Sequence, residues 1–172
     1  RFDVQDAALD WFTSYCAERT QVVVIGDDSS LVNEFRIGAP QGSVLGPRSF
    51  VAYAEDVTEI FYRHHVRHHL FADDMQCTGH SKPSKVHEVT AGLGACVAAV
   101  NKWCASKRLQ LNPQKTEVMW IGSVTNLSKL SSAEKLFKVG PDSISPSAVV
   151  RDLGVLFDSE LNKKSHISRI TS

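Results

Sequence analysis

The chain has 172 residues, of which 42% are hydrophobic and 22% charged, a length and composition that suit one globular domain with its own core. Its 19 lysine and arginine residues balance its 19 aspartate and glutamate residues, which excludes the strongly basic surface of a protein that coats nucleic acid. No apolar run approaches the roughly 18 residues of a membrane span, and the four cysteines show no CxxC spacing. We therefore expect a soluble chain with free thiols inside the cell, in the cytoplasm or the nucleus.

The first part of the chain predicts a helix followed by a β-hairpin. Apolar residues recur at helical spacing between Val4 and Ala17, which predicts an amphipathic helix. Thr20–Ile25 is rich in β-branched residues, the next residues have turn chemistry, and Leu31–Ile37 alternates, so a hairpin is expected here. Gly38–Gly46 holds three glycines and a proline, which predicts a loop whose backbone closely approaches another group.

The middle of the chain predicts two helices with a second hairpin between them. Apolar residues spaced by three and four after Pro47 predict a helix with that proline in its first turn. Short β-prone segments on both sides of residues 72–74 predict a hairpin whose turn carries two carboxylates. Ser84 is the expected N-cap of a long helix, whose apolar stripe ends at Trp103.

The last part of the chain contains weaker signals. Thr116–Ile121 is expected to form a strand, and Asn126–Pro146 a connector with little fixed structure. Val149–Phe157 predicts a pair of strands, whereas the polar segment Leu161–Ser172 is expected to fray.

Two pairs of adjacent aspartates are candidate metal ligands. Magnesium prefers hard oxygen ligands and is commonly held by one or two carboxylates together with substrate phosphates. An Asp-Asp turn is also common on surfaces that bind no metal, so neither pair establishes a site by itself. Right-hand polymerases place a glycine-rich substrate loop before the metal-binding turn. Because Gly38–Gly46 follows Asp27-Asp28 and precedes Asp73-Asp74, we assign the metal to the second pair and an ordinary hairpin turn to the first.

Four motifs follow one another along the chain: Pro40–Pro47, Phe71–Asp74, Leu109–Glu117 and Leu153–Val155. In this order they resemble the reverse transcriptases of non-long-terminal-repeat (LINE-type) retrotransposons. Trp11–Tyr15 and Arg19–Gln21 also resemble the segment that joins the first catalytic motif of these enzymes to their glycine loop. The resemblance therefore covers nearly the whole chain.

The resemblance implies an α+β fold. It resembles the palm of a right-hand polymerase, an antiparallel sheet backed by the helices that follow Pro47 and Ser84. The chain is expected to be a partial reverse transcriptase domain spanning residues 1–172. Its parts would be a connecting helix and hairpin (1–37), a palm with the glycine loop and the Asp-Asp hairpin (38–125), a connector (126–148), and primer-grip-like strands with a polar tail (149–172).

The resemblance also implies the chemistry of the site. Asp73 would be the firmer ligand of Mg²⁺ and Asp74 a second, primer-side or metal-adjacent carboxylate, with two ions in the complete enzyme and Mn²⁺ as a substitute. Lys115 would help pyrophosphate to leave, as a cation or a proton donor.

Further positions would contact the substrates, which are an RNA template, a DNA primer and deoxynucleoside triphosphates. Small or absent side chains in the glycine loop allow the backbone to approach the template base and the incoming nucleotide. The positions implied are Gln41, Gly42 and Ser43 for the template and nucleotide, Phe71 and Ala72 for the primer terminus, and Leu153, Gly154 and Val155 for the primer backbone.

One departure from the family pattern bears on activity. These enzymes use a further aspartate on an earlier palm strand, and Asp3, Asp6 and Asp10 do not replace it because they lie on or beside the first predicted helix. The start of the sequence shows neither an initiator methionine nor a signal peptide, and most of the fingers and the thumb are missing. We therefore expect a fragment that is not an active polymerase on its own. The alternative is a non-catalytic retroelement remnant that binds nucleic acid or protein.

Three other features have both a functional and an ordinary interpretation. His64, His65, His68 and His69 could bind zinc if His64 and His68 lay four apart on one helix, but a solvated junction is the preferred interpretation. Trp103 and Trp120 could stack on bases, although core packing is preferred. Two basic stretches could contact phosphate or remain solvated: Lys102, Lys107, Arg108 and Lys115, and then Lys163, Lys164 and Arg169.

Overall fold

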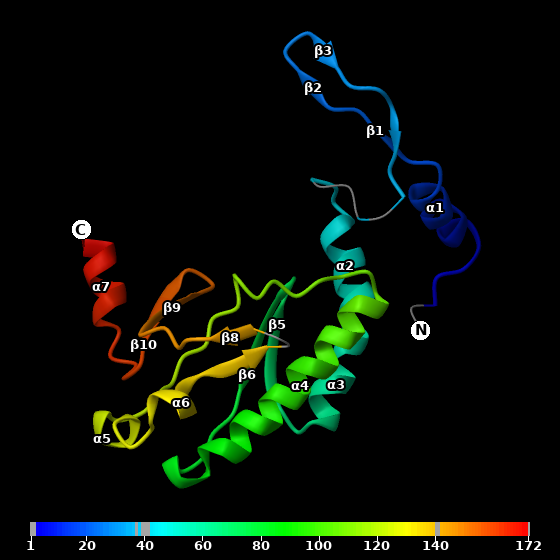
Figure 1. The fold of residues 1–172 in the computed structure, drawn as a ribbon. Coiled ribbons are helices and arrows are strands. Elements are labelled where there is room, and N and C mark those ends of the chain that lie inside the picture. The colour runs from blue at the N-terminus through cyan, green and yellow to red at the C-terminus, as the bar shows by residue number, and fades with distance from the viewer. Residues whose placement is uncertain (1–2, 37, 39–41, 140–141, 172) are drawn as a thin grey trace. The chain divides into compact units, whose positions relative to one another are not determined.

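The structure is a computed structural model that describes residues 3–36, 38, 42–139 and 142–171 (Figure 1). The chain divides into two compact units, residues 1–52 and 53–172, and we describe each unit separately. Within the described ranges, no helix is both long enough and apolar enough to cross a membrane.

The first unit begins with the predicted helix. Helix α1 spans Asp6–Cys16, which confirms the helix expected from Val4 to Ala17. Asp6 and Asp10 therefore lie on a helix, as expected. The aromatic residues of α1 pack on one another, with Trp11 stacked on Tyr15 at 5.3 Å between ring centroids. No residue of α1 is buried, so the contacts that its aromatic side chains make are mainly with one another.

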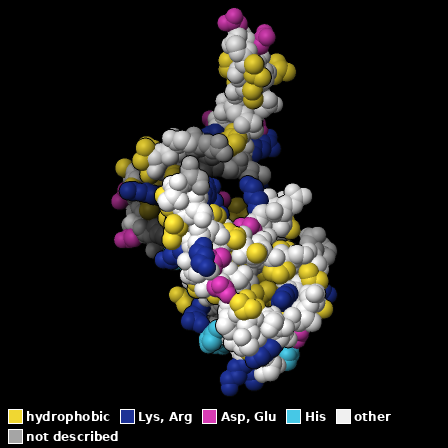
Figure 2. Space-filling model, turned by 90° about the vertical axis from the view of Figure 1, so that its left-hand side faces the viewer, with side chains coloured by type: hydrophobic (Ala, Val, Ile, Leu, Met, Phe, Trp, Pro, Cys, Tyr) yellow, Lys and Arg dark blue, Asp and Glu magenta, His cyan; other side chains and the backbone are white. Residues whose placement is uncertain are grey.

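The predicted hairpin of the first unit is confirmed, but its ladders are short. Strand β1 (Thr20–Gln21) pairs with β4 (Asn33–Glu34), and β2 (Val24–Ile25) pairs with β3 (Asp28–Ser29). Gly26, with a φ of 61°, takes the first position of the two-residue turn, where a left-handed conformation favours glycine. Figure 2 shows yellow hydrophobic side chains exposed along this hairpin and acidic ones at its tip. The exposed residues are Val22, Val23, Val24, Ile25, Leu31 and Val32.

A nearly continuous helical segment follows the glycine loop. It consists of α2 (Gly46–Ala54), the 3-10 turn η1 (Glu55–Val57) and α3 (Thr58–Arg63), which confirms the helix expected from Pro47.

The second predicted hairpin is also present. Strand β5 (Arg67–Phe71) pairs with β6 (Asp74–Thr78) in antiparallel register, with Leu70 opposite Met75. Residues alternate between exposed and half-buried along both strands, as expected for a hairpin with one face on a core.

The long helix α4 spans Val86–Ser106 and follows the 3-10 turn η2 (Pro83–Lys85). The expectation that Ser84 is its N-cap was wrong. Pro83 starts the 3-10 turn, Ser84 lies inside it, and Lys85 takes the N-cap position without a side-chain cap. A proline at the first helical position favours such an early start.

The core of the second unit lies between α3, α4 and the β5–β6 hairpin. Its buried members from η1 and α3 are Val57, Ile60 and Phe61, and those from α4 are Cys96, Val100 and Cys104. Leu70, Met75 and Cys77 of the hairpin pack against them. The helices after Pro47 and Ser84 therefore back the Asp-Asp hairpin, as predicted. The described strands form five separate two-stranded antiparallel pairs, a mixture of helices and strands that agrees with the predicted α+β class, whereas the palm-like sheet stays a prediction.

The region from residue 116 to residue 148 differs from its prediction. No strand forms at residues 116–121, where the Thr116 N–H bonds to the Pro113 carbonyl and the Val118 carbonyl accepts from the Ser147 N–H. Just beyond them, the Gly122 N–H bonds to the Ser159 carbonyl. The segment expected to be an irregular connector contains four short elements instead. They are α5 (Val124–Leu127), α6 (Ser132–Lys135), β7 (Phe137–Val139) and β8 (Asp142–Ile144).

The end of the chain contains the expected pair of strands and a helix that was not expected. Strands β9 (Val149–Asp152) and β10 (Val155–Asp158) pair in antiparallel register, which confirms that prediction. The fraying tail was wrong, because α7 spans Lys164–Thr171 and contacts β10. The Nδ1 atom of His166 accepts a hydrogen bond from the backbone N–H of Leu156, which ties α7 to that strand.

Candidate functional site

The end of the β5–β6 hairpin carries the predicted carboxylates. Phe71 pairs with Asp74, and Ala72 and Asp73 form the two-residue turn between them. All four residues are exposed, including Phe71 at 58%. The alternation along the strands places Phe71 and Asp74 on the face opposite the core, so an aromatic ring and a carboxylate lie side by side on the exposed face.

Ala72 has a φ of 53°, in the left-handed region that non-glycine residues rarely adopt. The first position of a two-residue turn with one positive φ is normally glycine, as Gly26 is in the other hairpin. The turn that carries Asp73 is therefore a strained one, and such strain often accompanies functional turns.

The chemistry of this turn fits part of a magnesium site. Asp73 and Asp74 supply two adjacent, exposed carboxylates, which are the hard oxygen ligands that magnesium prefers. Among the described residues, no third histidine, cysteine, aspartate or glutamate joins them to form a metal-binding group. Ions held here would take their other ligands from water and from substrate phosphates.

The β9–β10 hairpin carries the other residues that were predicted to contact the primer. Leu153 and Gly154 form its two-residue turn, with φ of 44° and 88°, and Val155 begins β10 opposite Asp152. The Nε2 atom of Gln76 on β6 donates a hydrogen bond of 2.9 Å to Oδ2 of Asp152. The exposed face of β6 is thereby joined to the strand that leads into Leu153–Val155.

Sequence reasoning missed the Gln76–Asp152 contact. The alternation of β6 could have placed Gln76 on the same face as Asp74, two residues away, but it could not have named a partner 76 residues along the chain.

Lys115 lies in a tight turn that Asn112 organises. The Asn112 side chain accepts a hydrogen bond from the Gln114 N–H, and its backbone carbonyl accepts from the Lys115 N–H and from the Thr116 hydroxyl. Lys115 is exposed. In the described part of the chain, no hydrogen bond or ion pair joins Lys115 to Asp73 or Asp74, so the structure does not bring these predicted residues together.

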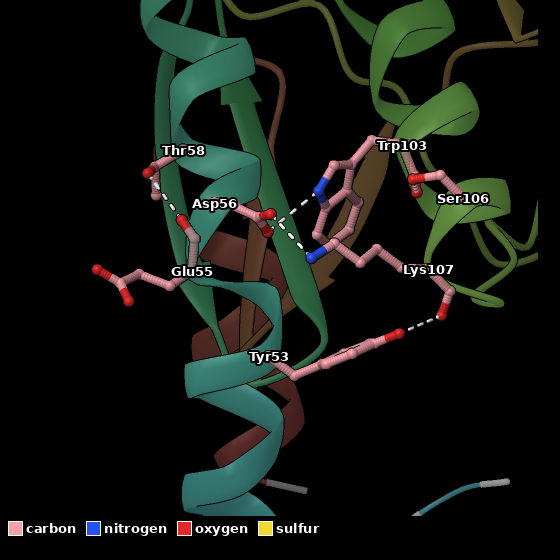
Figure 3. A network of polar contacts seen from close by, with 7 residues as sticks. All are labelled: Tyr53, Glu55, Asp56, Thr58, Trp103, Ser106 and Lys107. Atoms are coloured by element: carbon pink, nitrogen blue, oxygen red, sulfur yellow. Dashed lines mark hydrogen bonds and ion pairs between the residues drawn. The ribbon is translucent and has the colours of Figure 1, made fainter. Parts of the chain in front are cut away.

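A polar network fixes the helix end that precedes this turn (Figure 3). The Asp56 carboxylate accepts a hydrogen bond from the Trp103 indole at 3.1 Å and pairs with the Lys107 ammonium at 2.8 Å. The Tyr53 hydroxyl donates to the Lys107 carbonyl at 2.8 Å, and the Lys107 ammonium lies 5.1 Å from the centre of the Tyr53 ring. The predicted core role of Trp103 is confirmed, since it also packs against the buried cluster.

The helix ends in a Schellman motif. The Leu109 N–H bonds to the Cys104 carbonyl, the Arg108 N–H bonds to the Ala105 carbonyl, and Arg108 has a φ of 55°. Leu109 and Leu111 then pack against the core. The network of Figure 3 and this motif together determine where the chain leaves α4 and enters the Asn112 turn.

The glycine loop belongs to the first unit. Gln41 lies outside the described residues. Gly42 has a φ of 79°, and the Ser43 hydroxyl accepts a hydrogen bond of 2.9 Å from the Gly46 N–H and lies 3.0 Å from the Tyr15 hydroxyl. Ser43 therefore caps the start of α2, a structural role that the sequence analysis did not assign to it.

The histidines do not form the helical pair that a zinc site would need. His64 ends α3, His65 has a φ of 53°, and His68 lies on β5 with its ring stacked on Phe61 at 4.5 Å. The described residues contain no metal-binding group at this junction. Trp120 is half-buried and donates its indole N–H to the Lys135 carbonyl, which confirms a packing role.

The reverse transcriptase (RNA-dependent DNA polymerase) family model matches residues 6–155. The chain belongs to this family. The match spans the glycine loop, the Asp-Asp hairpin, the Asn112 turn and the β9–β10 turn, so the family assignment covers every candidate position described above. Reverse transcriptases generally use divalent metal ions, which agrees with the carboxylates at the hairpin end.

Two curated relatives are polymerases of transposable elements. A probable RNA-directed DNA polymerase from transposon BS of Drosophila melanogaster is 26% identical over 163 residues. An RNA-directed DNA polymerase from the mobile element jockey of the same species is 28% identical over 163 residues. The aligned segments cover 92% and 91% of this chain but 17% of each relative, so the chain corresponds to about a sixth of their length. No solved structure matches the chain significantly.

Proposed function

We propose that this chain forms part of the active site of a reverse transcriptase that extends a DNA primer on an RNA template with deoxynucleoside triphosphates. The observation that carries the proposal is the end of the β5–β6 hairpin, where Asp73 and Asp74 are both exposed inside the segment that matches the family. The same family match makes an RNA template, a DNA primer and nucleotides the proposed partners.

In this proposal Asp73 and Asp74 hold Mg²⁺, with Mn²⁺ as a substitute. When bound, two such ions stabilise the attacking and leaving oxygens of a phosphoryl transfer. The protein's own contribution is to fix the carboxylates. The core holds Leu70 and Met75 on the inner face of the hairpin, and the Phe71–Asp74 pair closes the turn.

The remaining positions contact the substrates. Phe71 offers an exposed ring and Ala72 a small side chain beside the carboxylates, which suits contact with the sugar and base of a primer terminus. Leu153, Gly154 and Val155 grip the primer backbone, and Gln41, Gly42 and Ser43 contact the template base and the incoming nucleotide. Lys115 assists the departure of pyrophosphate as a cation or proton donor.

We extend the proposal to an intracellular setting, in the cytoplasm or the nucleus. All four cysteines, Cys16, Cys77, Cys96 and Cys104, are free thiols, the state that a reducing compartment maintains.

The experiment has two parts, and each compares Asp73→Asn and Asp74→Asn with a matched pair of controls. Asp27→Asn and Asp28→Asn remove the same charges from the other exposed Asp-Asp hairpin. In the first part, Mn²⁺ is titrated into the 172-residue chain and binding is followed by paramagnetic resonance. We expect the variants at residues 73 and 74 to weaken binding at least fivefold and the controls to leave it unchanged.

In the second part, primer extension is measured with a polypeptide that carries this segment within the complete polymerase, and with the 172-residue chain alone. We expect extension by the former, its loss in Asp73→Asn, and no extension by the chain alone. Extension that survives Asp73→Asn would refute the proposal. Nucleic-acid binding without extension, insensitive to changes at residues 73 and 74, would favour the alternative of a non-catalytic binding module.

A further inference from the structure

Two side chains that no motif of the site includes contact the two ends of the glycine loop. Tyr15 comes from the end of α1, and Arg19 comes from the segment just before β1. Both are half-buried, and both lie in the same unit as the loop.

Arg19 makes one contact with the start of the loop and two with Phe35, just before it. Its Nη2 atom donates a hydrogen bond of 2.8 Å to the Gly38 carbonyl, and its guanidinium lies 4.8 Å from the centre of the Phe35 ring. The backbone carbonyl of Arg19 accepts a hydrogen bond of 2.7 Å from the Phe35 N–H. A planar guanidinium can stack on a ring and donate in its own plane at the same time, which an ammonium cannot.

The backbone conformation at position 38 and the nearby Phe35 ring both favour glycine there. Gly38 has a φ of 98°, and a Cβ atom added there would lie 3.3 Å from Cζ of Phe35. The Phe35 ring therefore packs against both the Arg19 guanidinium and the Gly38 backbone.

Tyr15 contacts the other end of the loop. Its hydroxyl lies 3.0 Å from the Ser43 hydroxyl, which in turn accepts the Gly46 N–H at the start of α2. The Tyr15 ring is stacked on the Trp11 ring, and this stacking restricts where the Tyr15 hydroxyl can lie. The loop is thus fixed at its start through a carbonyl and at its end through a helix cap.

Arg19 carries a charge that no acid offsets among the described residues. It forms no ion pair there, and its Nε atom is buried without a hydrogen-bond partner. A half-buried guanidinium without a carboxylate loses hydration. Its contacts with Gly38 and Phe35 partly compensate for this lost hydration. We infer that Arg19 is kept there to hold the loop.

We propose that Tyr15 and Arg19 are positioning residues for the incoming nucleotide: they fix Ser43 and Gly38, which are described parts of the glycine loop, before the substrate arrives. The inference rests on the proposed function, because it is the glycine loop of that site that they hold. Preorganisation of this kind lowers the entropy that the substrate must overcome on binding, so the residues act on nucleotide affinity more than on the chemical step.

The test uses two mild variants, Tyr15→Phe and Arg19→Lys, together with Arg19→Gln. The controls are Tyr62→Phe and Arg36→Gln. Tyr62 is an exposed tyrosine of the other unit, and Arg36 is an exposed arginine paired with Glu34 next to the same loop. In the 172-residue chain, we expect hydrogen exchange at the Gly46 amide to be at least threefold faster in the three test variants than in the wild type and the controls.

In the complete polymerase, we expect Arg19→Gln and Tyr15→Phe to raise KM for the deoxynucleoside triphosphate at least fivefold while kcat changes less than twofold. Arg19→Lys should not restore KM, since lysine keeps the charge but not the planar contact. An unchanged KM in these variants, or an equal rise in Arg36→Gln, would overturn the inference. If the wild-type polymerase shows no extension that depends on Asp73, the proposed function fails, and unchanged exchange at Gly46 would then refute the loop anchoring separately.

Discussion

The strength of the ion pair between Asp56 and Lys107 can be measured with a double-mutant cycle, and its coupling free energy can be predicted from the structure. The changes are Asp56→Asn, Lys107→Met and the double variant. Asparagine keeps an oxygen for the Trp103 indole, and methionine keeps an unbranched chain of similar length while it removes the ammonium that lies near the Tyr53 and Trp103 rings. The cycle therefore isolates the charge interaction from the packing around it.

The geometry sets the magnitude. The two side chains are 28% and 35% exposed and their charged atoms lie 2.8 Å apart. Coulomb attraction at that separation is about 1.5 kcal/mol in water and about 6 kcal/mol at an effective dielectric constant of ~20. Desolvation opposes most of the larger value, and exposed pairs are typically worth below ~1 kcal/mol. We expect a coupling of about 1 to 2 kcal/mol, reduced in 1 M salt.

The assay is urea unfolding of the four proteins at pH 7, in low and in high salt. The matched control is the cycle for Lys85 and Glu88, whose atoms lie 3.4 Å apart with the side chains 62% and 57% exposed. That cycle is expected to give a coupling close to zero. If the Asp56–Lys107 coupling equals the control, the pair is fully solvated and the network of Figure 3 does not fix the end of α4.

Four further predictions concern buried side chains, the cysteines and the end of the long helix. Phe61 is 1% exposed, so Phe61→Leu should lower the free energy of unfolding by about 1 to 2 kcal/mol, and a urea midpoint equal to that of the wild type would contradict this burial. Exposed Cys16 should react with a thiol reagent well before buried Cys96 and Cys104, which mass spectrometry of the labelled protein would show. Burial, together with the neighbouring Cys96, raises the pKa of Cys77 from 9.0 to about 11. The folded state thus holds this proton more tightly than the unfolded chain, and the resulting stability, present below pH 9, should be lost between pH 9 and pH 11 in unfolding curves. The loss should be smaller in Cys77→Ala, where only Cys96 and Cys104, whose pKa values burial also raises, still contribute. Arg108→Gly should raise the thermal midpoint by an amount equivalent to about 1 kcal/mol, because Arg108 has a φ of 55° at the position where helices normally end in glycine, and a lower midpoint would refute this.

Elements with a long period or a clear turn could be predicted from the sequence. The helices α1, α2 with α3, and α4 each repeat apolar residues over several turns, and β5–β6 and β9–β10 flank residues with turn chemistry. These signals are local, because each depends on residues fewer than about eight positions apart. The apolar faces of α3, α4 and β5–β6 pack on one core, which stabilises the elements that these local signals predict.

The segment from residue 124 to residue 144 could not be predicted in the same way. Strand β7 has three residues, and the alternation of Phe137, Lys138 and Val139 is too short to separate from chance. What makes it a strand is burial of Phe137 and Val139 together with its packing against α4, which lies far away in sequence. Helix α6 has four residues and depends on the capping box between Ser131 and Glu134, a signal present in the sequence as Ser-x-x-Glu.

The candidate site likewise has features that the sequence alone predicts and features that it does not. The choice between the two Asp-Asp pairs rests on the order of the motifs, which requires only positions along the chain, and that choice stays a prediction. The contacts that hold the site, such as Gln76 with Asp152 and Arg19 with Gly38, join segments that no local pattern relates. The positive φ of Ala72 was also invisible, because alanine at the first position of such a turn contradicts the usual preference for glycine.

That contradiction leads to a reciprocal test. In each hairpin the two-residue turn ends with the first aspartate of an Asp-Asp pair, and the second aspartate begins the next strand. The first turn position is Gly26, with a φ of 61°, in one hairpin and Ala72, with a φ of 53°, in the other. A left-handed conformation costs a non-glycine residue about 1 to 2 kcal/mol, and glycine's extra freedom in the unfolded chain offsets about 0.4 to 1 kcal/mol of the gain from replacing it. Ala72→Gly should therefore stabilise the chain by roughly 0.5 to 1 kcal/mol, and Gly26→Ala should destabilise it by a similar amount.

Activity separates the two turns. If the alanine holds Asp73 and Asp74 in one conformation, Ala72→Gly should reduce primer extension in the complete polymerase several-fold despite the gain in stability, because a freer turn positions the carboxylates less well. Gly26→Ala should leave extension within twofold, since Asp27 and Asp28 belong to a hairpin with no metal assigned to it. Equal or higher activity in Ala72→Gly would show that the strain at Ala72 has no part in placing the carboxylates, and the unusual residue at that turn would then need a purely structural explanation.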